Sequence, residues 1–243
     1  MMDDGNGEKV RLWESFLNLL FPLFCFVCGK PLEPDNRMFL CSLCLVNIRR
    51  IRSPVCGRCG RPGCNGVCAE CRKAYRYYNV ARAAGIYEGV LKECIHGLKY
   101  GRKPYLAKTL AGLMVDSFGI FPELAGCAVI VPVPLHRVRE RERGFNQAHL
   151  LAKAVGNAVG AGVSKRNLRR VRDAVPQTGL PRSLRLSNVR ELFSVGDPSE
   201  FADKEVLLID DVLTTGSTAD ECSKTLVEAG AKTVSVLTAA RGE

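Results

Sequence analysis

The stretch Lys204-Glu-Val-Leu-Leu-Ile-Asp-Asp-Val-Leu-Thr-Thr-Gly-Ser-Thr218 decides the fold of the second part of this chain. Its apolar run, Val206 to Ile209, is short and lies between charged residues, which is typical of a strand buried on both faces. Two carboxylates, Asp210 and Asp211, follow where we expect such a strand to leave the sheet. The stretch therefore predicts a central strand of an α/β sheet with an acidic pair at its end.

A turn of small and hydroxyl-bearing residues, Thr214 to Thr218, follows the acidic pair. Thr218 and Glu221 have the spacing of a capping box, so we expect a helix to begin there and to end near Gly230. The free N–H groups and the positive dipole end at the start of a helix suit a phosphate. The neighbouring carboxylates suit sugar hydroxyls or a phosphate-bound Mg²⁺ ion. The pattern predicts one site for a phosphate and a polyol, although many α/β proteins have such a strand, turn and helix without a ligand.

Length and composition describe a soluble globular protein. The 243 residues can form one large domain or two unequal ones, and the hydrophobic content of 47% is ordinary. The formal net charge of +10 favours an anionic partner such as phosphate, a nucleotide or nucleic acid. Eight thiolates binding two zinc ions would lower that charge to roughly +6. This correction weakens the case for nucleic acid.

The N-terminal segment, residues 1–24, is predicted to hold an amphipathic helix. The apolar part from Phe16 to Val27 has about a dozen residues, which is too short to span a bilayer. Acidic residues precede it, where a secretory signal would carry basic ones. We expect the helix to pack on the body of the protein, with docking to a membrane surface or a partner as the alternative. The expected setting is cytoplasmic with no transmembrane segment, where clustered cysteines bind metal more often than they form disulfides.

Eight of the twelve cysteines form four Cys-x-x-Cys pairs within residues 25–75. Tetrahedral Zn²⁺ takes four thiolates, so the four pairs predict two zinc sites in a double zinc ribbon. Cys25-Phe-Val-Cys-Gly-Lys-Pro31 and Cys56-Gly-Arg-Cys-Gly-Arg-Pro62 repeat one pattern, which favours pairing in sequence order; cross-braced pairing is the alternative. In sequence order, the ligands are Cys25, Cys28, Cys41 and Cys44 for one ion and Cys56, Cys59, Cys68 and Cys71 for the other.

These zinc sites are predicted to be structural, because four cysteines leave no open coordination position for water or substrate. Cys64 lies inside the second ribbon and is either a bystander or a substitute for a neighbouring ligand. Cys94, Cys127 and Cys222 lie in apolar contexts and are expected in the core.

Residues 76–243 alternate between strand and helix patterns. We expect strands over 80–87, 128–133, 206–209 and 233–240, and helices over 90–100, 104–118, 146–159 and from 218 onward. This alternation predicts the α/β class, with a mainly parallel sheet covered by helices on both faces. Ligands of such sheets bind beyond the carboxyl ends of the strands.

The strand over 128–133 leads into an arginine-rich run from His136 to Ala148. Guanidinium forks match phosphate oxygens, so this run predicts an anion-binding segment. Glutamates lie between the arginines, and an exposed, self-paired helix start is the alternative. The candidate phosphate ligands are Arg137, Arg139 and Arg143.

A second arginine-rich segment runs from Leu168 to Phe193 and contains Arg172, the fourth candidate ligand. It lacks a sustained apolar period, so we expect a long irregular loop with a function.

The stretch from Asp210 to Thr218 resembles the phosphoribosyl pyrophosphate loop of type I phosphoribosyltransferases. The resemblance implies that Asp210 and Asp211 hold the ribose 2′- and 3′-hydroxyls. It implies that Thr214, Thr215, Gly216, Ser217 and Thr218 wrap the 5′-phosphate, with Val212 and Leu213 as variable positions of the loop. The loop after the 128–133 strand would then bind pyrophosphate, and the 168–193 segment would close over it and exclude water.

Further motifs follow the cysteine pairs in a fixed order: Ile95-His-Gly-Leu-Lys-Tyr-Gly-Arg102, Val131-Pro-Val-Pro-Leu-His-Arg137, Arg143-Gly-Phe-Asn-Gln-Ala148 and Ser187-Asn-Val-Arg190. Together with the Asp210 loop, this order resembles the competence-associated ComF family from about Cys25 to Arg241. The resemblance implies a double zinc ribbon followed by a phosphoribosyltransferase-like domain. It also implies a link to natural transformation.

The leading hypothesis is a phosphoribosyltransferase-like protein that binds phosphoribosyl pyrophosphate, or a related sugar phosphate, with Mg²⁺. Transfer of phosphoribose to an unknown acceptor would rely on charge stabilisation and positioning, since the sequence shows no obvious general base. The alternative is a protein of natural transformation without turnover. It would bind single-stranded DNA, or act as an adaptor for a competence helicase or another uptake protein.

Overall fold

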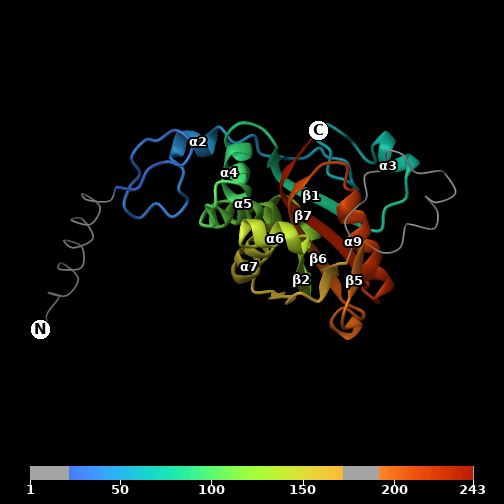
Figure 1. Ribbon diagram of the computed structural model, residues 1–243. Coiled ribbons are helices and arrows are strands. Elements are labelled where there is room, and N and C mark those ends of the chain that lie inside the picture. Colours follow the sequence, from blue (N-terminus) through green and yellow to red (C-terminus); the bar gives the residue numbers. More distant parts are fainter. Residues whose placement is uncertain (1–21, 172–191, 243) are drawn as a thin grey trace, which may run out of the picture.

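The computed structural model describes residues 22–171 and 192–242, and its centre is a five-stranded sheet (Figure 1). The strand order is β1-β7-β6-β2-β3, and every neighbouring pair is parallel. The strands are β1 Val80–Ile86, β2 Val129–Pro132, β3 Gly162–Val163, β6 Glu205–Leu213 and β7 Thr233–Arg241. Four of these strands were predicted from the sequence. The two-residue β3 was not.

Helices cover both faces of this sheet (Figure 1). Leu207 and Ile209 of β6 belong to one apolar core with the helices α4, α5 and α7. Val206 and Leu208 belong to a second core with α9. The alternation follows from the strand geometry, because successive side chains point to opposite faces. The main helices are α4 Gly89–Lys99, α5 Leu106–Ile120, α7 Gln147–Val159 and α9 Ser217–Glu228. The predicted fold class is therefore confirmed.

The strand that carries the acidic pair is longer than its apolar run. β6 continues to Leu213, because Val212 and Leu213 pair with Ala240 and Arg241 of β7. Both aspartates therefore lie within the strand, and the expectation that they follow its end is wrong.

Helix α9 begins at Ser217, one residue before the predicted start. Gly216 is the N-cap with a φ of 78° and has no side chain to cap the helix, but the Thr215 Oγ1 accepts the Ser217 N–H at 3.4 Å. Glycine adopts this left-handed conformation at little cost, so the chain turns into the helix directly after it. The capping box predicted from Thr218 and Glu221 is not formed.

The arginine-rich run after β2 is a short helix, α6 Arg137–Arg143. The His136 side chain accepts a hydrogen bond from the Val138 N–H at its start, and Gly144 ends it with a φ of 84°. The exposed helix start of the alternative is therefore confirmed, whereas its self-pairing is not. One of its glutamates, Glu140, pairs outside the run with Arg166.

The second arginine-rich segment is not irregular at its ends. β4 Leu168–Arg170 and β5 Phe193–Val195 form an antiparallel pair in which Leu168 lies opposite Val195. Leu168 and Phe193 are buried in the core beneath α9, and this packing holds the two ends together. Arg172 and most of the predicted N-terminal helix lie outside the described residues.

Both cysteine-rich units pack on the α/β body (Figure 1). The first ribbon, residues 25–44, places Cys25 and Cys44 in the same core as α4 and α5. The second ribbon, residues 56–71, lies against β1, where the buried Arg82 donates to the carbonyl oxygen of Gly57 at 3.1 Å. Short helices close the ribbons, and three-residue 3₁₀ turns precede β2 and β6. These elements are α2 Ser42–Val46, α3 Ala69–Lys73, η1 Pro122–Leu124 and η2 Pro198–Glu200.

Cys94 and Cys222 are fully buried and Cys127 is half-buried against the core, which confirms their predicted positions. Across the described ranges, each helix is either too short or too polar to cross a membrane.

Candidate functional site

The acidic pair, the loop after β6 and the helix after β2 lie together at the carboxyl ends of the central strands. Val133, just after β2, donates its N–H to the carbonyl oxygen of Ile209 at 2.9 Å, so the chain leaving β2 runs beside Asp210. The Thr214–Thr218 loop follows β6, and α6 follows β2, at this same edge. In parallel α/β sheets, ligands bind beyond the carboxyl ends of the strands.

The two aspartates leave β6 on opposite faces of the sheet, because neighbouring side chains alternate. Asp211 is 3% exposed, and its Oδ1 lies 2.7 Å from the Nζ of Lys99 at the end of α4. Its Oδ2 is buried, and no group in the described ranges hydrogen-bonds to it. Lys99 was missed by the sequence reasoning, because nothing in the pattern of α4 relates its last residue to β6.

Asp210 is partly exposed, and its Oδ1 accepts the Asp211 N–H at 2.8 Å. Burial and the neighbouring negative charge of Asp211 raise the pKa of this carboxyl to about 8. These two effects favour the neutral form of the Asp210 carboxyl.

Aromatic side chains cluster near the end of α4, the helix that carries Lys99. The Tyr87 hydroxyl and the His96 Nε2 are 2.9 Å apart, and the ring of Tyr100 contacts the His96 ring edge-on at 5.6 Å. The Arg143 guanidinium lies 5.6 Å from the centre of the Tyr100 ring. The motif from Ile95 to Arg102 thus lies beside the acidic pair.

The Thr214–Thr218 loop lies open at the surface. Thr214, Thr215, Ser217 and Thr218 are exposed, and the hydroxyls of Thr215 and Ser217 are 2.9 Å apart. The N-terminus of α9, a helix of 12 residues, begins within this loop. Hydroxyls and free N–H groups together form a geometry suited to a phosphate.

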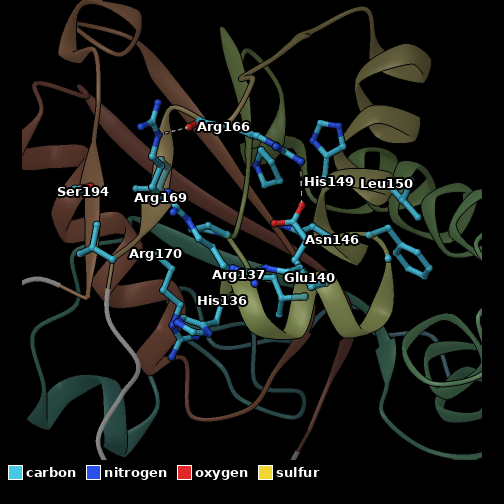
Figure 2. A pocket seen from close by; sticks show the side chains of 18 residues that line it. His136, Arg137, Glu140, Asn146, His149, Leu150, Arg166, Arg169, Arg170 and Ser194 are labelled. Carbon is cyan, nitrogen blue, oxygen red and sulfur yellow. Dashed lines mark hydrogen bonds and ion pairs between the residues drawn. The ribbon is translucent and has the colours of Figure 1, made fainter.

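A hollow of about 1150 Å³ lies between α6, the start of α7 and the β4–β5 pair. Figure 2 shows the labelled arginines of α6 and β4 around this one space. Of the predicted ligands, Arg137 lines the hollow, whereas Arg139 and Arg143 are absent from its described lining. The lining arginines are Arg137, Arg141, Arg166, Arg169 and Arg170.

The hollow carries an excess of positive charge. Glu140, the one carboxylate among the described residues of the lining, pairs with Arg166 at 3.1 Å, and Arg169 donates to the Arg166 carbonyl oxygen at 3.1 Å (Figure 2). Arg143 instead donates to the Gln147 side chain. Arg166 was not among the candidates from the sequence, and Arg169 and Arg170 were expected in an irregular segment, not in the strand pair that brings them beside α6. Guanidinium groups in such a concave site suit a polyanion.

The eight predicted zinc ligands form two clusters. Within each cluster the four Sγ atoms lie within 4.8 Å of one another, and the clusters are Cys25, Cys28, Cys41, Cys44 and Cys56, Cys59, Cys68, Cys71. Sγ–Sγ distances of 3.6 Å and 3.7 Å match the roughly 3.8 Å expected for a tetrahedral Zn–S bond of about 2.3 Å. The pairing follows sequence order, and Cys64 belongs to neither cluster of the described residues.

Backbone N–H groups favour the thiolate form of one cysteine in each cluster. Burial disfavours the thiolates of Cys25 and Cys56, but backbone N–H groups that donate to the sulfur lower the pKa of each to about 6. The Cys68 N–H, for example, donates to the Cys56 Sγ at 3.3 Å. Thiolates bind Zn²⁺, so the donor set fits two structural zinc ions.

The chain is similar to known proteins over its cysteine-rich part and over most of its length. Residues 16–72 match the family model of the double zinc ribbon domain. The chain is 30% identical over 223 residues to the DNA utilization protein YhgH of Salmonella typhi, which covers 90% of this chain and 96% of that protein. It is 28% identical over 209 residues to the competence protein ComFC of Bacillus subtilis, covering 82% and 81% of the two chains. The glutamine phosphoribosylpyrophosphate amidotransferase of B. subtilis superposes with a TM-score of 0.39 and 22% identity, over 55% of this chain and 26% of that one.

A further relative fixes the family. The competence protein F of Haemophilus influenzae is 32% identical over 208 residues, which cover 83% of this chain and 90% of that protein. At this identity and coverage, with both cysteine clusters in place, the chain belongs to the ComF family of competence-associated proteins.

Proposed function

We propose that this protein binds phosphoribosyl pyrophosphate with Mg²⁺ at the carboxyl edge of its sheet and transfers the phosphoribosyl group to an acceptor. The observation that carries the proposal is the exposed Thr214–Thr218 loop at the start of α9, directly after Asp210 and Asp211. In this proposal the loop holds the 5′-phosphate and the acidic pair holds the ribose hydroxyls. Val212 and Leu213 contribute through the backbone, since Leu213 is buried.

The acidic pair also fits a magnesium ion. Mg²⁺ prefers hard oxygen ligands, and the buried Asp211 Oδ2 has no hydrogen-bond partner in the described ranges. Asp211 would hold the ion, and the bound ion would neutralise charge on the diphosphate. Lys99, which contacts the other Asp211 oxygen, would keep this carboxylate in place.

The proposed reaction is a displacement at the anomeric carbon. The acceptor nucleophile forms a bond to this carbon, and the bond to the diphosphate oxygen breaks with its electron pair leaving on pyrophosphate. The acceptor loses its proton to solvent. The arginine-lined hollow beside β2 supports the step, since Arg137 and its neighbours offer charge to the leaving group.

Titration calorimetry with phosphoribosyl pyrophosphate and Mg²⁺ tests the binding. We expect saturable binding that weakens at least tenfold, roughly the effect of one lost charged contact, in Asp211→Asn. Asp203→Asn is the control, because Asp203 lies outside the site with a φ of 55° that asparagine tolerates. A folded, zinc-loaded protein that gives no heat of binding would overturn the proposal.

The relatives named for competence and DNA utilization support a role in DNA uptake, which we place in the cytoplasm. A second candidate function is binding of single-stranded DNA, or adaptor binding to an uptake protein, without turnover. The arginine-lined hollow and the exposed Tyr100 ring favour it, because stacking and charge together bind single strands. Affinity for an oligonucleotide should then fall steeply with salt and be unaffected by phosphoribosyl pyrophosphate. Competition between the two ligands would instead assign the hollow to the transfer reaction.

A further inference from the structure

The second ribbon contacts the back of the proposed phosphate loop. A small gap of about 20 Å³, room for about one water molecule, separates them. Cys59 and Cys71, two of the predicted zinc ligands, line one side of this gap. Thr214, Thr215 and Gly216 line the other. The predicted zinc site and the proposed phosphate loop therefore lie on opposite sides of one small gap.

Arg241 joins the two sides directly. It is the last residue of β7 and is 7% exposed. Its Nη1 donates to the Cys59 carbonyl oxygen at 2.6 Å, and its Nη2 lies 3.7 Å from the Cys59 Sγ. Its backbone pairs with Leu213, and the next residue, Gly242, donates its N–H to the Leu213 carbonyl oxygen at 2.9 Å. One side chain therefore bonds to a zinc ligand while its backbone fixes the residue before Thr214.

Arg76, in the chain that leaves the second ribbon, makes a second connection. Its Nη2 donates to the Thr215 carbonyl oxygen at 3.3 Å, and its Nη1 lies 3.7 Å from the Asp220 Oδ2 in the first turn of α9. The Tyr77 N–H donates to the Asp220 Oδ1 at 2.7 Å. The loop and the helix start are thus both attached to this segment.

The first ribbon contacts other elements. The Thr109 hydroxyl on α5 donates to the Met38 carbonyl oxygen, and the rings of Phe39 and Tyr105 lie 4.5 Å apart. Within the described residues, no cysteine of the first ribbon lines either hollow. Of the two predicted zinc sites, the second therefore lies beside the Thr214–Thr218 loop, and the first lies against α5.

We propose that zinc binding at the second ribbon and ligand binding at the Thr214–Thr218 loop are coupled, with Arg241 as the positioning residue that carries the coupling. This inference rests on the proposed function for the identity of the ligand. Coupling between two sites is reciprocal, so a ligand that tightens with zinc must also retain the zinc.

The test follows each zinc site separately. The full chain is exposed to a zinc-selective chelator and a thiol-alkylating reagent, with and without phosphoribosyl pyrophosphate and Mg²⁺, and mass spectrometry gives the alkylation rate of each cysteine. We expect the ligand to slow alkylation of the second cluster about fivefold or more and to affect the first cluster less. Equal slowing at both clusters, or at neither despite ligand binding, would overturn the inference.

Three substitutions distinguish coupling between the second zinc site and the loop from simple stabilisation of the second ribbon. Arg241→Gln removes the charged donor to Cys59, so the protection of the second cluster by the ligand should fall severalfold, and the contact of Arg76 with Thr215 should keep the remainder. Arg82→Gln is the matched control, because Arg82 also donates to the second ribbon, at the carbonyls of Cys56 and Gly57, but does so from β1. It should speed zinc loss and keep the protection by ligand. Arg241→Lys keeps a charge and should restore part of the coupling, and protection that persists undiminished in Arg241→Gln would contradict the proposal.

Hydrogen exchange distinguishes this inference from the proposed function. In the absence of ligand, Arg241→Gln should increase amide exchange across residues 214–218 about fivefold or more relative to Arg82→Gln. Unchanged exchange would overturn the coupling whatever ligand binds. Increased exchange in a protein that fails to bind phosphoribosyl pyrophosphate would overturn only the proposed function.

Discussion

Asp210 is a carboxyl whose folded environment opposes its charge. Burial and the charge of Asp211 raise its pKa from 3.8 to about 8. The unfolded chain therefore releases this proton at lower pH than the folded one, and ionisation favours unfolding. The stabilising contribution is complete below pH 3.8 and is lost as the pH rises toward about 8.

Asp210→Asn should remove this pH dependence. Urea unfolding between about pH 6.5 and 9 gives the free energy of unfolding of each variant. We expect the wild-type protein to lose stability over this interval relative to Asp210→Asn. Parallel profiles for the two proteins would show that the carboxyl titrates elsewhere.

Gly216 has a conformation that side chains oppose. Its φ is 78°, and a Cβ there would lie 3.2 Å from the Tyr78 hydroxyl. Gly216→Ala should lower the free energy of unfolding by about 1 kcal/mol or more. Gly119→Ala is the control, because Gly119 is exposed in α5 with open space at its Cβ position, and alanine favours a helix. Unfolding in urea measures both, and equal effects would contradict the argument.

At the scale of elements, the sequence predicts the strands that are buried on both faces. It does not predict the strand ends that are set by hydrogen bonding to a neighbouring strand. The apolar run Val206 to Ile209 marks the part of β6 buried on both faces, but the end of the strand is set by its pairing with β7. β4 and β5 together have three apolar residues, Leu168, Phe193 and Val195, and the burial of Leu168 and Phe193 depends on packing beneath α9. No periodicity within so short a strand reports such a contact.

Phe193 should therefore be essential for the strand pair that borders the arginine-lined hollow. Its side chain is 2% exposed, so Phe193→Ala should cost about 3–5 kcal/mol in the free energy of unfolding. Val171→Ala, at a residue that is 52% exposed on the same segment, should cost less than about 0.5 kcal/mol. Denaturant titration measures both, and a small loss for Phe193→Ala would show that the strand pair contributes little to the core.

At the scale of the molecule, the zinc clusters were predictable because their ligands are close in sequence. The arginine-lined hollow was not, since Arg137 comes from α6 whereas Arg169 and Arg170 come from β4. These residues are far apart in the sequence. They lie together because the chain returns through α7 and β3 and places β4 beside α6. The loop after β6 was predictable for the same reason as the zinc sites: one continuous stretch contains it.

Loss of one zinc ligand should affect the whole molecule. Cys44 belongs to the first cluster and to the main core, so Cys44→Ser should halve the zinc content and lower the melting temperature by several degrees, roughly 2–4 °C per kcal/mol for a chain of this size. Cys64→Ser is the control and should retain two zinc ions per chain. Elemental analysis and calorimetry measure the two quantities. An unchanged melting temperature in Cys44→Ser would show that the first ribbon is not part of the cooperative unit.

The packing of Phe26 against Gly97 has a practical consequence. A Cβ on Gly97 would lie 2.4 Å from the Phe26 ring, so α4 is shaped to accept that ring, and Leu40 of the same ribbon is fully buried nearby. A recombinant fragment that starts at residue 76 would expose this apolar surface of α4 to solvent. Exposed apolar patches promote aggregation. Anyone who wishes to purify the sheet-forming half for assays should clone it together with its cysteine-rich neighbour.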